Sequence, residues 1–83
     1  MSDRFIKKTL QLSLEFDTYI IKRPRQFAKI PNKATVFFTV AGDESYNRSS
    51  RELMERTRGK KEKIVEARKV GRIWKIEPVS IRN

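Results

Sequence analysis

The sequence predicts an α+β fold: a small two-layer α-β-α-β-β domain in which an N-terminal helix packs on a mixed three-stranded sheet. Three observations support it: a helical period over the first 23 residues, a continuously apolar segment at 34–42, and two short β-type clusters near the C-terminal end. The 83 residues, 37% of them hydrophobic, are expected to form a single domain, 1–83, with one compact core.

The first predicted helix spans residues 2–23. Five apolar residues recur with a period near 3.6 residues, which is typical of a helix with one buried side: Phe5, Leu12, Phe16, Tyr19 and Ile20. Arg23-Pro24 ends the helix, because proline disfavours the helical conformation of the residue before it. Ile6, Leu10 and Leu14 are expected to widen this buried side.

A short helical turn is expected next, in the segment RQFAKIPNK, with Phe27 and Ile30 pointing inward. The strongest strand signal follows it, from Ala34 to Gly42, where β-branched and aromatic residues are almost continuous. A continuously apolar strand predicts a central position in the sheet, covered on both faces.

A second long helix is predicted from Asp43 to Arg58. Asp43 or Ser45 can cap its start, and Gly59 lies where a left-handed residue commonly ends a helix. The side of the helix that is expected to face inward is narrow and consists of Tyr46, Ser50, Leu53, Met54 and Thr57.

The C-terminal part is predicted to be a hairpin, with strands at about 62–69 and 72–78 and a turn near Val70-Gly71. Pro78 restricts the last strand to an edge of the sheet, because proline has no N–H to donate. A continued helix through residues 60–70 stays an open alternative, because Ile64, Val65 and Arg68 also have helical spacing.

Composition excludes several chemistries. The chain has no cysteine and no histidine, so it lacks disulfides, thiolate nucleophiles and the usual proton shuttle. No nucleophile stands beside a base and no glycine-rich phosphate loop occurs, so we expect a non-enzymatic protein without catalytic residues, metal site or cofactor. The N-terminus has no apolar leader and no apolar run is long enough for a membrane span, so a soluble cytoplasmic protein is expected.

Two acidic motifs are expected to have structural roles. Glu15 and Asp17 in LEFDTY are two residues apart on a helix, so they point away from each other and cannot form a catalytic pair. One of them is expected to cross the domain and bond the turn at Ile30-Pro31 or an arginine. In AGDESYN, Asp43-Glu44 favours a helix cap over a phosphate site, because its negative charge would repel the anion.

The segment LQLSLEFDTYIIKRPRQFAKIPNKATVFF resembles a family of small uncharacterised prokaryotic proteins with the pattern L-S-x-E-F-D-x-Y…P-x-F-x-x-x-I-P-x-x-A. The likeness continues into the acidic turn before Tyr46-Asn47 and covers about two-thirds of the chain, but it does not include the basic C-terminal third. The resemblance implies the fold and no activity. The matching residues are Leu12, Ser13, Glu15, Phe16, Asp17, Tyr19, Phe27, Ile30, Pro31 and Ala34.

Charge is the strongest compositional signal, with 20 basic and 10 acidic residues. Residues 1–33 carry +5 and residues 48–75 carry +7. Side chains alternate along the predicted hairpin strands, so several cations are expected on the solvent side, next to the cations at the end of the preceding helix. Trp74 or Tyr46, if its ring is exposed, can stack on a nucleic-acid base. This predicted basic ridge consists of Arg51, Arg58, Lys60, Lys61, Lys63, Arg68, Arg72 and Lys75.

The leading hypothesis is therefore a small basic domain that binds DNA or RNA chiefly through phosphate contacts. The competing interpretation of the ridge is that charged side chains blunt an edge hairpin and Trp74 belongs to the core. The alternative function is a protein–protein module, either a homodimer or an accessory subunit, whose apolar helix face or open sheet edge meets a partner.

Overall fold

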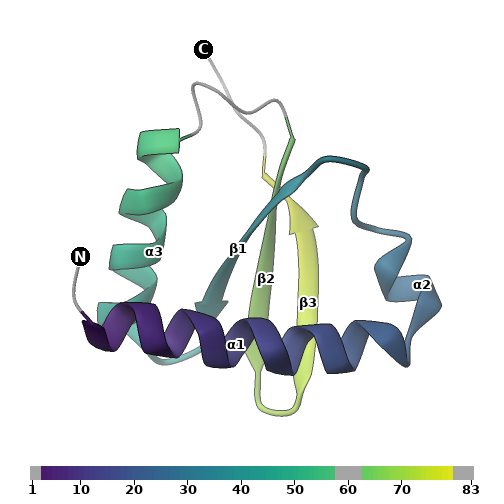
Figure 1. Cartoon of the computed structure of the whole chain (residues 1–83), viewed down its shortest axis with the longest axis horizontal. Helices are drawn as coiled ribbons and strands as arrows, with labels where there is room; N and C mark the ends of the chain where they lie inside the picture. Colours follow the sequence, from purple (N-terminus) through teal and green to yellow (C-terminus); the bar gives the residue numbers. More distant parts are fainter. Residues whose placement is uncertain (1–2, 58–62, 80–83) are drawn as a thin grey trace.

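The computed structural model describes residues 3–57 and 63–79 of the chain. It confirms the predicted fold class: a small α+β architecture with an N-terminal helix, a mixed three-stranded sheet and a further helix (Figure 1). The elements are α1 (Asp3–Ile21), α2 (Pro24–Phe27), β1 (Thr35–Val40), α3 (Glu44–Thr57), β2 (Ile64–Val70) and β3 (Ile73–Pro78).

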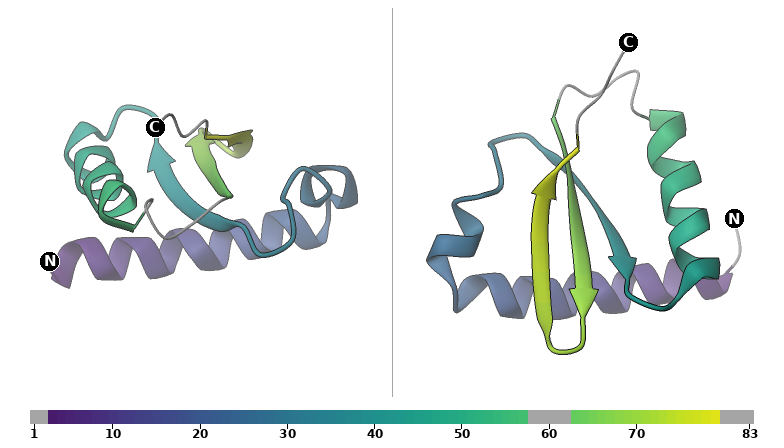
Figure 2. Two further views of the ribbon diagram at one scale, coloured as in Figure 1. Left: turned by 90° about the horizontal axis from the view of Figure 1, so that it is seen from above. Right: turned by 180° about the vertical axis from the view of Figure 1, so that it is seen from behind.

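The strand order is β1-β2-β3, with β1 parallel to β2 and β2 antiparallel to β3. Helix α1 crosses one face of this sheet, and α3 lies beside β1 at the sheet's edge (Figure 2). No helix of the described ranges covers the opposite face of the sheet (Figure 2). The architecture therefore has two layers, as predicted, and it buries side chains mainly between α1 and one face of the sheet.

Aromatic rings fill the space between α1 and the sheet. Phe16 of α1 packs edge-on against Phe38 of β1 and Trp74 of β3, with ring centroids 5.6 and 5.1 Å apart. Phe5 stacks on Tyr46 of α3 at 5.1 Å. These contacts connect α1, α3 and two strands in one core, in which edge-to-face ring pairs add to the stabilisation from burial.

The outer side of α1 differs from the prediction. Ile6, Leu10 and Leu14 were expected to widen the buried side of the helix, yet their exposed fractions are 44%, 62% and 70%. A helix on one sheet buries only an arc of its surface, and Phe5, Leu12 and Phe16 already fill that arc. Phe27 was also expected inside and is 60% exposed, because the short α2 lies at the periphery of the domain (Figure 1).

The predicted central position of β1 is wrong, because β1 is an edge strand and β2 is central. The outer edge of β1 is instead closed by polar side chains of α3. Asn47 accepts a hydrogen bond from the Val40 N–H at 2.7 Å and donates one to the Val40 carbonyl at 2.8 Å. Ser50 donates to the Phe38 carbonyl at 2.6 Å. An apolar strand can therefore occupy this edge without exposing these backbone groups to solvent.

The C-terminal hairpin is confirmed within the described ranges, so residues 64–70 are strand and not continued helix. Gly71 has φ +62° in the two-residue turn, a left-handed conformation that an L side chain rarely adopts. Pro78 lies on β3, the second edge strand, as predicted. The helix end expected at Arg58 and Gly59 lies outside the described residues.

Candidate functional site

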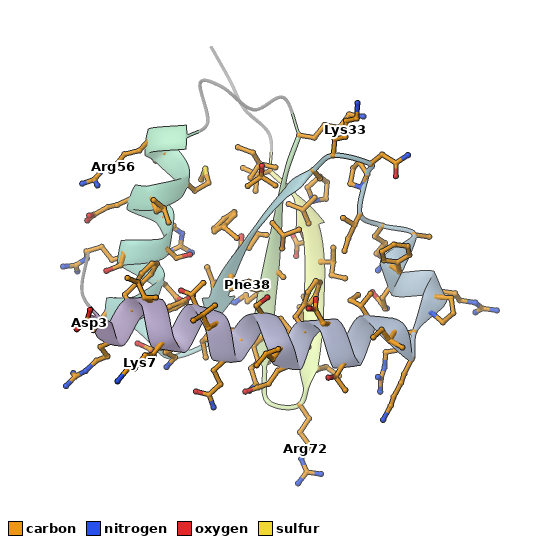
Figure 3. All side chains as sticks on the ribbon, in the orientation of Figure 1. Asp3, Lys7, Lys33, Phe38, Arg56 and Arg72 are labelled. Atoms are coloured by element: carbon orange, nitrogen blue, oxygen red, sulfur yellow. The ribbon has the colours of Figure 1, made fainter. Side chains whose placement is uncertain are left out.

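The structure describes five of the eight basic-ridge residues: Arg51, Lys63, Arg68, Arg72 and Lys75. Arg68 and Lys75 are cross-strand neighbours on β2 and β3, whereas Arg72 projects from the far end of the hairpin (Figure 3). Lys63 precedes β2, and Arg51 belongs to α3. The described members therefore lie at different ends of the sheet and on α3. Arg58, Lys60 and Lys61 lie outside the described residues.

Arg51 and Arg68 line a groove between α3 and β2, in which basic and acidic side chains are equal in number. This groove of about 520 Å³ is lined by three arginines and three glutamates, together with Gly42 and Asn47. Arg68 lies 3.8 Å from a carboxylate oxygen of Glu66, which also accepts a 2.6 Å hydrogen bond from Thr39. The charges of the three arginines and three glutamates cancel, so the lining of this groove has no net positive charge. The charged lining residues are Glu44, Arg48, Arg51, Glu52, Glu55 and Arg68.

A second groove, between the C-terminal end of α1 and the β2–β3 turn, is strongly cationic. It has a volume of about 360 Å³ and four of its lining side chains are basic, against one carboxylate. That carboxylate, Glu15, accepts a hydrogen bond from Lys69. The remaining cations, Lys22, Arg23 and Arg72, are exposed and come from two separate segments of the chain. We call this set of three residues and the space between them the cationic groove.

Arg23 is fixed in the cationic groove by its own helix. Its guanidinium lies 4.0 Å from the centre of the Tyr19 ring and donates a hydrogen bond to the Tyr19 carbonyl at 3.4 Å. Arginine carries five N–H donors, so donors remain for a phosphate or carboxylate. Because Pro24 follows, the helix ends here, and the side chain lies at the open end of α1.

The sequence contains a signal for the cationic groove that total composition does not reveal. From Thr18 to Gly42 there is no acidic residue, while five residues are basic: Lys22, Arg23, Arg25, Lys29 and Lys33. The contribution of Arg72 could not be found in the same way, because it depends on how the hairpin turn lies beside α1. Arg72 lines the same groove as Lys22 and Arg23, although it comes from the hairpin turn.

The acidic motifs hold the domain together. Glu15 crosses to Lys69 of β2, instead of the turn or the arginine that was expected. Asp43 caps α3, as predicted, by accepting a 3.1 Å hydrogen bond from the Tyr46 N–H. A hydrogen bond from Lys8, with that backbone N–H, holds the pKa of Asp43 below its ordinary value. A negative group therefore already occupies the start of α3.

The aromatic residues proposed for base stacking are not available at the surface. Trp74 and Tyr46 are buried in the core, with exposed fractions of 5% and 6%. Burial raises the pKa of the Tyr46 hydroxyl, which lies 2.9 Å from the Thr9 hydroxyl. Within 3–57 and 63–79, no three carboxylates lie close enough to hold a metal ion, and no helix is long and apolar enough to cross a membrane.

Fold and grooves together define a small basic α+β domain with a cationic end and no described metal cluster. The chain belongs to the family of unknown function DUF5647, whose model matches residues 4–81. This match confirms the expectation of an uncharacterised family; the residue pattern and the prokaryotic origin stay predictions. No curated protein and no solved structure matches the chain.

Proposed function

We propose that this protein is a non-enzymatic domain that binds nucleic acid through phosphate contacts in the cationic groove. The observation that supports this most is the presence of Lys22, Arg23 and Arg72 together, facing one groove whose only carboxylate is bonded to Lys69. Cations that neutralise phosphates release bound counterions, which gives affinity that falls steeply with salt. With Trp74 and Tyr46 buried, the proposal includes no base stacking by them and hence little sequence preference.

The test measures binding of labelled single-stranded DNA, duplex DNA and RNA by fluorescence anisotropy at several salt concentrations between about 50 and 200 mM. The variant Lys22→Ala/Arg23→Ala/Arg72→Ala is expected to weaken binding to all three. For duplex DNA it should also lower the slope of log K against log salt by roughly 2.7, about 0.9 for each lost phosphate contact.

The matched control is Arg48→Ala/Arg51→Ala/Lys75→Ala, which removes the same charge from exposed positions away from the cationic groove. An equal loss of affinity in both triple variants would refute the groove and leave only a general effect of net charge. A third variant, Lys60→Ala/Lys61→Ala/Lys63→Ala, tests three lysines of the predicted basic ridge. Absence of binding by the wild-type protein at the lowest salt would refute the function itself.

The second candidate function is a protein–protein module, and one specific observation favours it. Four large apolar residues of α1 are exposed: Ile6, Leu10, Leu14 and Ile21. Apolar side chains in a row on one helix are unusual on a surface that stays in water.

A further inference from the structure

The outer side of α1 carries a regular seam of six residues. Leu10, Leu14 and Ile21 on this seam have exposed fractions of 62%, 70% and 78%, and no described element covers that side of the helix (Figure 2). The positions follow each other at spacings of four and three residues, the a/d spacing of a coiled-coil helix. The outer seam consists of Asp3, Lys7, Leu10, Leu14, Asp17 and Ile21.

We propose that the outer seam packs against the same seam of a second copy of this chain, with the two α1 helices antiparallel. The order of spacings, four-three-four-three-four, is the same in both directions along the helix. A reversed copy therefore meets every seam position at the same level, about a two-fold axis that passes near Leu12. In this register Leu10 lies against the partner's Leu14, and Leu14 against the partner's Leu10.

The charges on the seam select this orientation. In the antiparallel register Lys7 faces the partner's Asp17, and Asp17 faces the partner's Lys7, so two ion pairs flank the four leucines. In a parallel pair each charge would face its own copy, lysine against lysine and aspartate against aspartate, which is unfavourable. Neither Lys7 nor Asp17 forms an ion pair with the described residues of its own chain, and Lys7 projects away from the domain (Figure 3).

A second copy fits this surface better than an unrelated partner does. A two-fold interface needs a patch that is complementary to itself, and a seam with mirrored leucines flanked by Lys7 on one side and Asp17 on the other has that property. The net charge of +10 opposes contact between most other surfaces of two copies. The edge of β1 at Phe38 and Val40 is already bonded to α3, so pairing of these groups between sheets is blocked.

The proposed dimer has a geometric consequence for the cationic grooves. The two-fold axis is perpendicular to α1 and runs along the general direction of the strands, so both β2–β3 turns point the same way. Lys22 lies ten residues from the axis at Leu12, which puts the two grooves about 30 Å apart along the helices. The dimer contact itself does not depend on nucleic-acid binding.

The test begins with sedimentation of the full chain at concentrations from about 1 to 200 μM, a range that covers micromolar affinity. We expect a monomer–dimer equilibrium, and Leu10→Glu/Leu14→Glu should raise the dissociation constant at least ~100-fold, because four buried leucines are lost per dimer. Circular dichroism checks that this variant stays folded. A wild-type chain that stays monomeric throughout this range overturns the proposal.

Charge reversal then tests the register. Lys7→Asp alone and Asp17→Lys alone should each weaken the dimer about tenfold, because both ion pairs become like-charge contacts. The double variant Lys7→Asp/Asp17→Lys should return to within about threefold of wild type, since the pairs are restored with opposite sign. Lys29→Asp, an exposed change of the same charge outside the seam, is the matched control.

Because the chain has no cysteine, single cysteines report the orientation directly. A mixture of Leu10→Cys and Leu14→Cys chains should form a disulfide-linked dimer under mild oxidation, and each variant alone should form little. Cross-linking of each variant with itself would show a parallel pair and overturn the proposed register. Failure of these tests while salt-dependent nucleic-acid binding persists would remove the dimer and leave the proposed function intact.

Discussion

Substitution of Asn47 by alanine is expected to destabilise the domain strongly, because this side chain closes the edge of β1. Asn47 is 5% exposed and makes two short hydrogen bonds to the N–H and carbonyl of Val40. A buried backbone group left without a partner costs about 1–3 kcal/mol. Water can enter from the neighbouring groove, which Asn47 lines, so we take the lower part of that range for each group and expect a loss of about 2–4 kcal/mol.

That loss is large for a chain of this size. At roughly 0.05–0.15 kcal/mol per residue, 83 residues give a free energy of unfolding of about 4–12 kcal/mol. Urea titration followed by circular dichroism and by the fluorescence of Trp74, the single tryptophan and a core residue, measures the change. Both signals should report the same shifted midpoint.

Two neighbouring variants serve as controls. Ser49→Ala changes an exposed residue of the same helix and should alter the free energy of unfolding by no more than about 0.5 kcal/mol. Asn47→Asp keeps the acceptor for the Val40 N–H but turns a carboxylate oxygen toward the Val40 carbonyl, so it should be at least as destabilising as alanine. An Asn47→Ala variant within about 0.5 kcal/mol of wild type would refute the role assigned to this edge closure.

Two further predictions concern pH and the proposed assembly. Burial raises the pKa of Tyr46 above its ordinary value of 10.0, so its contribution to stability is complete below that pH and is lost as pH rises toward the folded-state pKa. Tyr46→Phe should therefore show a smaller decline in the free energy of unfolding above pH 10.0 than wild type in denaturant titrations, and an identical decline would contradict the burial effect. If the dimer presents both cationic grooves to one nucleic acid, a duplex of about 20 base pairs should bind wild type at least tenfold more tightly than it binds Leu10→Glu/Leu14→Glu. A DNA hairpin with a stem of about 8 base pairs is too short to span ~30 Å, so it should bind wild type and Leu10→Glu/Leu14→Glu equally. Anisotropy titrations at one salt concentration measure both affinities.

The fold class could be predicted because its signals are local. The apolar period of α1, the β-branched segment of β1 and the glycine between β2 and β3 each specify an element from neighbouring residues alone. Sheet order is different, because it depends on which backbone groups find partners far along the chain. Asn47 and Ser50 give β1 those partners from α3, and nothing in their sequence positions indicates that they replace a neighbouring strand.

The cationic groove was only partly predictable for a similar reason. The acid-free stretch that contains Lys22 and Arg23 is present in the sequence but did not enter the predicted basic ridge, and the charge count pointed instead to Arg51 and Arg68, which lie in a groove among carboxylates. Composition counts charges along the sequence, whereas a binding surface depends on which opposite charges are brought beside them by the fold. Arg72 joins Lys22 and Arg23 only through the packing of the hairpin against α1.

The errors about α1 and β1 have one physical origin, and it bears on function. Both elements are more apolar than a two-layer domain can bury, since one sheet face and one helix side meet in a single interface. For β1 the chain itself covers the outer edge of the apolar strand, because side chains of α3 bond the backbone at Phe38 and Val40. On the outer side of α1 no described residue covers the apolar side chains, and Leu10 and Leu14 stay exposed. The charges of Lys7 and Asp17 on this side of α1 would repel a parallel copy and attract an antiparallel one, which is why the proposed dimer places this surplus apolar surface against a second copy.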